Sequence, residues 1–274
     1  MLPTLGIIAG NGLLPSELAN TYLKQGGQCY IIALEGECDI DLIKNFEYNS
    51  FYLGSVGAVL DYCRKNKIEE IIFVGGVNRP NLKSIKLDLT GSLLMAKIIK
   101  QKFLGDDKIL KVIAKFFEGK GFKVISAKDI LSIEYANKND QNNVITDNNP
   151  SALDLKDIEF GIKVANDLGK LDIGQSVIIE NGYVLGVEAA EGTDNLITRC
   201  ALLRKKSFGG ILVKIMKPFQ DHRMDIPVIG PDTIDNLAKF KYNGVAVEKT
   251  GVIVVKEEVT RTLANKFGIF ILKI

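Results

Sequence analysis

The hydrophobic positions of this chain fall into short apolar runs and longer segments in which apolar residues recur every three or four positions. Runs of the first kind are typical of buried strands, and segments of the second kind are typical of amphipathic helices. In the first half, strand-like runs at 5–9, 30–34, 70–74 and 121–125 alternate with helical segments that include 56–67, 93–103 and 106–120. This alternation predicts an α/β fold with a parallel sheet.

The second half of the chain also predicts α/β structure and contains one clear hairpin. Two apolar runs flank Asn181-Gly182, a dipeptide typical of the tight turn between antiparallel strands. Ser151 is the expected cap of a helix that ends near residue 166 or 168. Further strands are expected at 210–216, 244–248, 252–255 and 269–272, and further helices at 193–205, 233–240 and 257–267.

An asparagine- and aspartate-rich stretch, 134–150, interrupts the apolar pattern between the two halves. With 274 residues the chain is longer than most single domains. We therefore predict an α/β domain over residues 1–136 and a second, distinct α/β domain over 137–274, joined by a short linker in this stretch.

Composition and charge exclude several classes of protein. The net charge is only +2 and the lysines alternate with carboxylates, which argues against a nucleic-acid partner. Cys29, Cys38, Cys63 and Cys200 lack the spacing of a zinc site or a disulfide framework, so a reducing cytoplasm is expected. No apolar stretch reaches the roughly 18 residues needed to span a bilayer, and membrane contact is therefore expected to be peripheral.

The strongest candidate for chemistry is the segment 209–231, where an apolar strand runs into a charged loop. Lys214, Lys217 and Arg223 can neutralise phosphate oxygens. Asp221 and Asp225 offer the hard carboxylate oxygens that Mg²⁺ prefers. In an extended loop these two aspartates would project to the same side and could reach one metal-bridged pyrophosphate. A solvated charged loop after an edge strand is the alternative.

Other groups near this segment could contribute to the same site. Glu188, Glu191 and Asp194 cluster where a strand meets a helix, and they could complete an oxygen-rich magnesium site, although Thr193 or Asp194 could equally be an N-cap. His222 is the only histidine and an obvious general base. We rank it below the aspartates, because a metal-bound water needs less help from a base.

Two glycine loops follow predicted strands, Gly10-Asn11-Gly12 and Gly75-Gly76-Val77-Asn78-Arg79. Ligands of open parallel sheets bind beyond the carboxyl ends of the strands, so these loops are candidate contacts to a nucleotide or phosphate. A dinucleotide fingerprint would need a glycine where Pro15 stands, while Glu35 keeps a ribose contact open. An NAD(P)-binding oxidoreductase and a non-catalytic nucleotide-binding protein therefore remain alternatives, as do simple tight turns.

Taken together, these motifs resemble the UDP-2,3-diacylglucosamine pyrophosphatases of the LpxI type, lipid A pathway enzymes of Gram-negative bacteria. The resemblance covers almost the whole chain. Its most specific parts are Val187-Glu188-Ala189-Ala190-Glu191-Gly192-Thr193-Asp194 and the lysine, aspartate and proline pattern from Lys214 to Pro231.

The resemblance implies a Rossmann-like N-terminal domain, a distinct C-terminal α/β domain, and magnesium-dependent hydrolysis to 2,3-diacylglucosamine 1-phosphate and UMP. It implies a cytoplasmic protein peripheral to the inner membrane, and it leaves open whether the chain forms a homodimer. We expect catalytic roles for Asp221, Asp225, Lys214, Lys217 and Arg223, and metal binding by Asp221, Asp225, Glu188 and Glu191. The expected substrate-binding residues are Gly10, Asn11, Gly12, Gly75, Gly76, Asn78, Arg79, Glu191, Gly192, Thr193 and Asp194.

Overall fold

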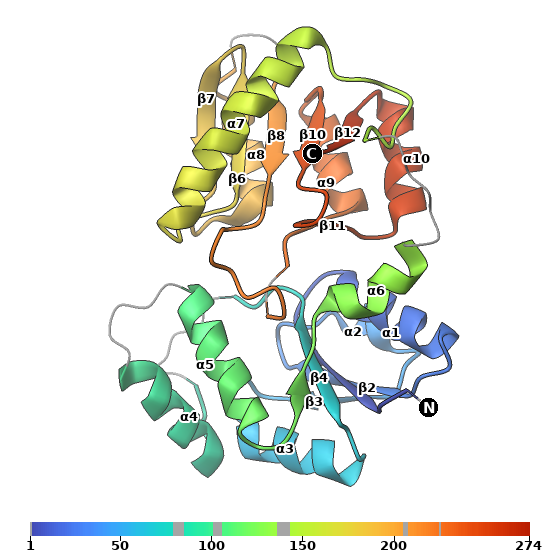
Figure 1. The fold of residues 1–274 in the computed structure, drawn as a ribbon, viewed down its shortest axis with the longest axis vertical. Helices are drawn as coiled ribbons and strands as arrows, with labels where there is room; N and C mark the ends of the chain where they lie inside the picture. Colours follow the sequence, from blue (N-terminus) through green and yellow to red (C-terminus); the bar gives the residue numbers. More distant parts are fainter. Residues whose placement is uncertain (1, 79–84, 101–105, 136–142, 205–207, 225) are drawn as a thin grey trace. The chain divides into compact units, whose positions relative to one another are not determined.

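The structure, a computed structural model, describes residues 2–78, 85–100, 106–135, 143–204, 208–224 and 226–274. The chain divides into two compact units, each with its own α/β core (Figure 1). The N-terminal unit comprises Met1–Asn139 together with Asp221–Asp225, and the C-terminal unit comprises Asp140–Gln220 and Ile226–Ile274. The expected boundary between residues 136 and 137 lies outside the described residues.

The N-terminal unit is built on a five-stranded parallel sheet in the order β3-β2-β1-β4-β5. The strands are β1 (Leu5–Ala9), β2 (Cys29–Leu34), β3 (Tyr48–Phe51), β4 (Glu70–Val74) and β5 (Lys123–Val124). The order reverses between β1 and β4, the switch point at which doubly wound sheets leave a crevice for ligands. This confirms the Rossmann-like fold. The apolar pattern did not predict β3, because three of its four side chains are exposed.

Helices cover this sheet, and Figure 1 shows them on both sides of the strands. They are α1 (Leu14–Lys24), α2 (Ile40–Ile43), α3 (Val56–Lys65), α4 (Leu89–Lys100), α5 (Asp106–Glu118) and α6 (Ala127–Tyr135). Helix α1 packs against α6, while α4 packs between α3 and α5. The apolar faces of α3, α4 and α5 form one hydrophobic cluster with the sheet, and Met224 belongs to this cluster. The core of the N-terminal unit therefore contains a side chain from far along the sequence.

The C-terminal unit has a mixed sheet in the order β12-β10-β8-β6-β7. Its strands are β6 (Ser176–Glu180), β7 (Tyr183–Val187), β8 (Ile211–Lys214), β10 (Gly244–Val247) and β12 (Phe270–Lys273). β12, β10 and β8 are parallel, whereas β6 runs antiparallel to both β8 and β7. Asn181 (φ 52°) and Gly182 (φ 79°) form the tight turn of the β6–β7 hairpin, which confirms the expected hairpin.

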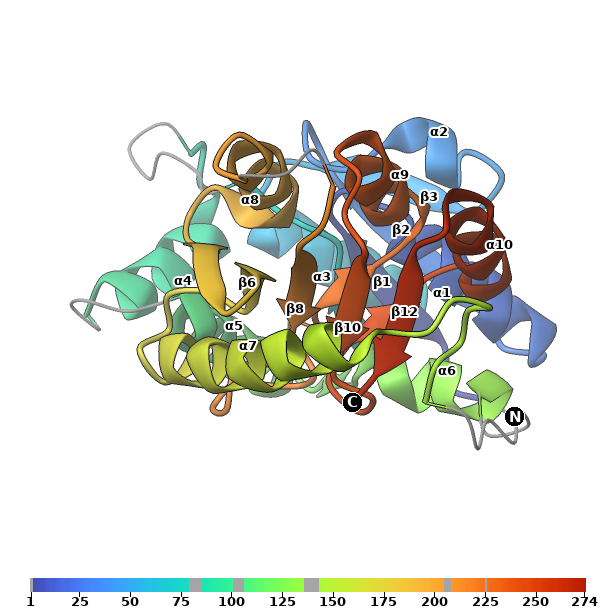
Figure 2. The ribbon, with the colours of Figure 1, turned by 90° about the horizontal axis from the view of Figure 1, so that it is seen from above.

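Figure 2 shows α7 on one face of this sheet and α8, α9 and α10 on the other. The helices are α7 (Ala152–Lys170), α8 (Gly192–Ala201), α9 (Pro231–Lys239) and α10 (Glu257–Phe267), and a separate pair of short strands consists of β9 (Val228–Ile229) and β11 (Ile253–Val254). Ser151 caps α7 through a capping box with Asp154, as expected. Within the described residues, none of the helices has the length and hydropathy needed to cross a membrane.

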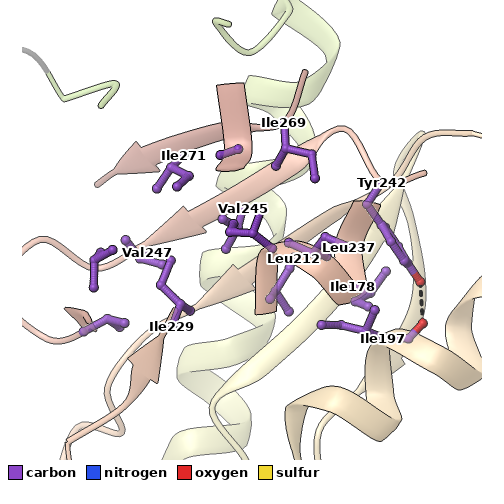
Figure 3. Packing of buried hydrophobic residues seen from close by; sticks show 14 of the residues in the cluster. Ile178, Ile197, Leu212, Ile229, Leu237, Tyr242, Val245, Val247, Ile269 and Ile271 are labelled. Atoms are coloured by element: carbon purple, nitrogen blue, oxygen red, sulfur yellow. Dashed lines mark hydrogen bonds between the residues drawn. The ribbon is translucent and has the colours of Figure 1, made fainter. Parts of the chain in front are cut away.

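Apolar side chains from β6, β8, β10 and β12, together with Ile229 of β9 and Val254 of β11, meet the helices in the core of the C-terminal unit (Figure 3). Tyr242 closes one end of this cluster, where its hydroxyl donates a 2.8 Å hydrogen bond to the carbonyl of Ile197. Ile145 belongs to the same core, and its N–H donates to the carbonyl of Ile271. The expectation that the whole 134–150 stretch is a linker is therefore wrong for its second half, which packs along β12.

Candidate functional site

A buried chain of polar groups lies at the carboxyl end of β8. Lys214 is 5% exposed, and its Nζ donates to the hydroxyl of Thr193 over 2.7 Å. The Thr193 hydroxyl donates in turn to Glu188 Oε1, also over 2.7 Å. Ser176 Oγ lies 3.4 Å from the same Thr193 hydroxyl. Among the described residues, Lys214 forms an ion pair with none, so its charge is balanced only indirectly. An unneutralised buried ammonium is costly, and this arrangement favours an anionic ligand beside it.

The N-terminus of α8 lies beside Lys214. Glu191 occupies the N-cap position without capping the helix by its side chain, so N–H groups of the first turn remain available. Gly192 has φ +76°, and a side chain there would meet nothing within 4 Å. Backbone N–H groups, the helix dipole and a buried lysine together form a site for a phosphate-like anion. The alternative that Thr193 or Asp194 is the N-cap is wrong, because Glu191 occupies that position and the Thr193 hydroxyl joins Lys214 to Glu188.

Lys217 is held by a different carboxylate. Its Nζ lies 2.7 Å from Oδ1 of Asp172, and its side chain is 10% exposed. A Cβ on Gly169 would come within 2.8 Å of Pro218, so a small residue on α7 lets the segment after β8 pack closely. Lys217 is thus firmly positioned, and its charge is largely balanced by Asp172.

The loop after Gln220 forms turns within the N-terminal unit. The N–H of Met224 donates to the carbonyl of Asp221, and the side chain of Met224 is 5% exposed. The extended geometry expected for this loop is therefore wrong, because buried Met224 and the turn fold the chain back. Asp225 lies outside the described residues, so its distance from Asp221 stays untested.

Arg223 and Asp221 form a two-pronged ion pair. Nε and Nη2 of Arg223 lie 3.0 and 2.9 Å from Oδ1 and Oδ2 of Asp221, while Nη1 lies 2.6 Å from Oε1 of Glu118. Hydrogen bonds from Arg223 hold the pKa of Asp221 below its ordinary value, and the carboxylates raise the pKa of Arg223. Asp221 is therefore ionised at neutral pH and paired with an arginine.

His222 contributes its backbone to this loop. Its carbonyl accepts a 2.8 Å hydrogen bond from the hydroxyl of Ser126, at the start of α6. This contact does not require an imidazole, and the rank of the histidine as a general base stays a prediction.

Two further carboxylates expected at a metal site have structural partners. Arg199 donates to Glu191 Oε1 from both Nε and Nη2. A backbone hydrogen bond at Glu191 and, after it, the hydrogen bonds from Arg199 lower the pKa of Glu191. Asp194 lies in the first turn of α8, where its carboxylate oxygen Oδ1 accepts a 3.4 Å hydrogen bond from Asn236 Nδ2. Within the described part of the chain, no three histidine, cysteine or acidic side chains are grouped as ligands of one metal ion.

The two glycine loops contact each other at the switch point of the N-terminal sheet. Asn11 and Gly76 form a two-way backbone bridge, with N···O distances of 2.8 and 3.2 Å. A Cβ on Gly10 would come within 2.2 Å of the Gly76 carbonyl, and one on Gly75 within 2.5 Å of the Asn11 carbonyl. Close packing therefore requires Gly10 and Gly75. Gly12 differs, because it has φ +92° and open space where a side chain would lie.

Asn78, Arg79 and Pro15 are the remaining residues of the glycine loops and the segments that follow them. The backbone and side-chain amides of Asn78 both donate to Glu37 Oε2, at 2.8 and 3.0 Å, so this asparagine anchors its loop to the end of β2. Arg79 lies outside the described residues. Pro15 lies at the start of α1 and is buried. It occupies the position at which a dinucleotide fingerprint would have its third glycine.

Sequence reasoning missed the partners that hold the candidate residues. They are Ser176, Asp172, Glu118 and Glu37, and each lies far from its partner along the chain. These residues become neighbours through tertiary packing.

The sheet orders and the buried lysine define the class of this protein, a two-unit α/β protein with a Rossmann-like sheet and a cationic centre in its second sheet. The LpxI N-terminal domain model matches residues 4–133, and the LpxI C-terminal domain model matches residues 141–272. The chain is also 31% identical to the UDP-2,3-diacylglucosamine pyrophosphatase LpxI of Caulobacter vibrioides, over 98% of this chain and 96% of that protein. The chain belongs to the LpxI family.

Proposed function

We propose that this protein hydrolyses the pyrophosphate bond of UDP-2,3-diacylglucosamine, giving 2,3-diacylglucosamine 1-phosphate and UMP in lipid A biosynthesis. The Caulobacter relative bears the name of this activity and matches nearly the full length of the chain. The observation that carries the proposal is Lys214, a buried cation that is joined to Thr193 beside an uncapped helix N-terminus. A pyrophosphate would bring negative charge into direct contact with this ammonium, which is joined to Glu188 only through Thr193.

Thr193 fixes the direction in which Lys214 presents its charge. The hydroxyl has a single hydrogen, which it gives to Glu188, and it therefore accepts from Lys214. The two other N–H bonds of the ammonium remain for substrate oxygens. In the reaction, water forms a new P–O bond and the bridging P–O bond breaks, so negative charge develops on phosphoryl oxygens. A positioned ammonium and helix N–H groups stabilise that charge.

Asp221 and Arg223 are the second part of the proposed machinery. The ion pair keeps Asp221 ionised and holds its carboxylate in one orientation. An arginine already paired with carboxylates attracts phosphate less strongly than a free one does. We therefore assign Arg223 mainly to positioning Asp221, and Lys214 to contact with phosphate. Lys217, Asp225 and the loop residues Gly12 and Asn11 remain candidate substrate contacts.

Magnesium is the metal that we propose for the reaction. The described carboxylates form no closed cage, and Asp221, Glu188 and Glu191 each have protein partners. Protein magnesium sites commonly use one or two carboxylates and the substrate phosphates, and oxygen donors of this kind fit the ion. Asp221 and Asp225, which belong to the same unit, would hold it. Bound magnesium would polarise phosphoryl oxygens and lower the pKa of a water molecule.

Product analysis with and without magnesium tests this function. The full-length protein is incubated with UDP-2,3-diacylglucosamine, and UMP and the sugar 1-phosphate are measured. We expect both products in equal amounts, loss of turnover in EDTA, and recovery when magnesium is added in excess. Full turnover in EDTA would contradict the metal. Binding of substrate without turnover would instead indicate a nucleotide-binding protein, and reduction of NAD(P) would indicate an oxidoreductase.

We also propose that the protein works at the cytoplasmic face of the inner membrane as a peripheral protein. Its proposed substrate carries two acyl chains and resides in a bilayer. The described helices include none that could cross one. Washing membranes with alkaline carbonate should release the protein, and retention after that treatment would contradict peripheral association.

A further inference from the structure

Helix α4 presents an apolar face to solvent, where a surface helix normally carries polar side chains. Leu89 is 89% exposed and Leu93 is 64% exposed. Together with exposed Ala96 and Lys100, they follow the i, i+4, i+7, i+11 spacing of a single helix face. Figure 1 shows α4 at the periphery of its own unit, beyond α5. This stripe consists of three apolar residues and a terminal lysine, and Ser92, Lys97 and Ile99 beside it are also exposed.

The opposite face of α4 fixes the rotation of the helix. Gly91 and Leu94 are buried, and Ile98 packs against the hydrophobic cluster of α3 and α5. A Cβ on Gly91 would come within 2.2 Å of the Gly54 carbonyl, so this side of the helix lies tightly on the loop before α3. The exposed leucines cannot turn inward without breaking these contacts.

The charge of this segment is one-sided. Residues 85–100 contain Lys86, Lys97 and Lys100, and their one acid is Asp88. Both oxygens of Asp88 accept hydrogen bonds from backbone N–H groups of α3 and α4. Exposed apolar side chains combined with lysines are typical of helices that lie in the interface of an anionic bilayer.

Another exposed apolar stretch makes a useful contrast. Leu153 and Leu155 on α7 are 51% and 48% exposed, but residues 151–159 are net negative, with Asp154, buried Asp157 and Glu159 against the single lysine Lys156. Negative charge there would be repelled by anionic lipid. Charge therefore distinguishes α4 from α7 as a membrane contact.

We propose that the exposed face of α4 docks on the surface of an anionic phospholipid bilayer, with Leu89 and Leu93 inserted among the lipids and the lysines near the headgroups. The benefit of docking rests on the proposed function, because an acylated substrate is reached at that surface. The docking itself follows from the exposed side chains and can be measured without any substrate.

Vesicle sedimentation of the full-length protein tests the docking surface. Vesicles contain phosphatidylcholine alone or mixed with phosphatidylglycerol. We expect wild type to bind the mixed vesicles preferentially and to lose binding at high salt. The double variant Leu89→Glu/Leu93→Glu should partition about tenfold or more weakly, because it replaces two inserted apolar side chains with charges. Leu153→Glu/Leu155→Glu is the control with the same charge change, and it should bind as wild type does.

Each contrary outcome has a clear reading. Wild-type binding by the α4 variant, equal loss in the α7 control, or no vesicle binding by wild type would overturn the docking surface. The docking surface would also be overturned if wild type were a dimer that binds no vesicles and the α4 variant were a monomer. That result would assign this face to self-association. Thermal unfolding checks that both variants are folded.

With detergent-dispersed substrate, the α4 variant should hydrolyse UDP-2,3-diacylglucosamine at the wild-type rate. Vesicle binding without hydrolysis by wild type would contradict the proposed function and leave the docking surface standing.

Discussion

Arg223 donates a 2.6 Å hydrogen bond to Glu118, a residue 105 positions earlier in the chain. The pair ties the loop between β8 and β9 to the end of α5 in the N-terminal unit. Met224 adds an apolar contact, because it belongs to the hydrophobic cluster of that unit. The loop that carries Asp221 is therefore built into the N-terminal unit, although strands of the C-terminal unit precede and follow it.

The Asp221–Arg223 pair predicts a pH dependence of stability. The folded protein holds the pKa of Asp221 below its ordinary value of 3.8, chiefly through hydrogen bonds from Arg223. A carboxyl group whose pKa is lower in the folded protein than in the unfolded chain stabilises the fold at pH values above its pKa in the unfolded chain. This stabilisation is lost as the pH falls through its pKa in the folded protein. Between neutral pH and about pH 3, wild type should lose more unfolding free energy than Arg223→Gln does, as measured by urea unfolding.

The matched control for this measurement is Lys170→Gln. Lys170 pairs with Asp167 on the surface of α7, where both side chains are more than half exposed. Exposed ion pairs contribute little, so this variant should follow the wild-type pH profile. Parallel profiles for wild type and Arg223→Gln would contradict a role for the ion pair in stability.

The buried network at β8 predicts a loss of turnover without loss of folding. Lys214→Met removes the cation and keeps most of the buried volume, and it should lower kcat by roughly a hundredfold or more, the scale for one electrostatic stabiliser. Thr193→Val should also lower kcat, because the hydroxyl that orients Lys214 is lost. Thr193→Ser keeps the hydroxyl and should retain most activity.

Steady-state kinetics and thermal unfolding of these variants are measured together. A structural role alone would lower the Tm and leave kcat per folded molecule unchanged. Wild-type kcat in folded Lys214→Met would remove Lys214 from the proposed machinery.

The loop residues make distinct predictions for activity. Asp221→Ala and Asp225→Ala should each lower kcat by roughly a hundredfold or more. His222→Ala should remain near wild type, since Ser126 bonds the backbone carbonyl of residue 222 and not its ring. Single-turnover hydrolysis measures the three variants side by side. Loss of activity confined to His222→Ala would assign the general base to the histidine.

Substitution of Asp88, a half-buried loop residue, is predicted to have a large effect on stability. Its Oδ2 accepts from the N–H of Gly57 at 2.7 Å, and its Oδ1 accepts from the N–H of Gly91 at 2.6 Å. One side chain thus caps α3, whose own N-cap Ser55 makes no side-chain bond, and also caps α4. Asp88→Ala should lower the unfolding free energy by about 1 to 2 kcal/mol for each cap. Calorimetry would detect this as a Tm lower by several degrees.

Asp61→Ala is the control for Asp88→Ala. Asp61 is an exposed aspartate on α3 that pairs only with nearby Arg64 among the described residues. Its loss should change the Tm little. Equal effects from the two substitutions would show that charge, and not capping, accounts for the result.

The sequence by itself determined the local structure and the family. Apolar runs marked the buried strands β1, β2, β4 and β6, because a strand covered on its faces must be apolar along its length. Asn181-Gly182 marked the hairpin, because its turn needs two residues that tolerate positive φ. The short exposed strand β3 lacked such a signal, and the apolar character of Ile145 was hidden among polar neighbours.

Only the tertiary structure decided which charges meet. Lys214 and Thr193 are 21 positions apart, and Arg223 and Glu118 are 105 apart, so no local spacing reports these contacts. Burial also decided the geometry of the 221–224 loop, since Met224 packs into a core and turns a chain that was expected to be extended. Local patterns follow from backbone periodicity, which each segment carries in its own residues. Long-range ion pairs depend on how complete sheets and helices pack, and that information is spread over the whole chain.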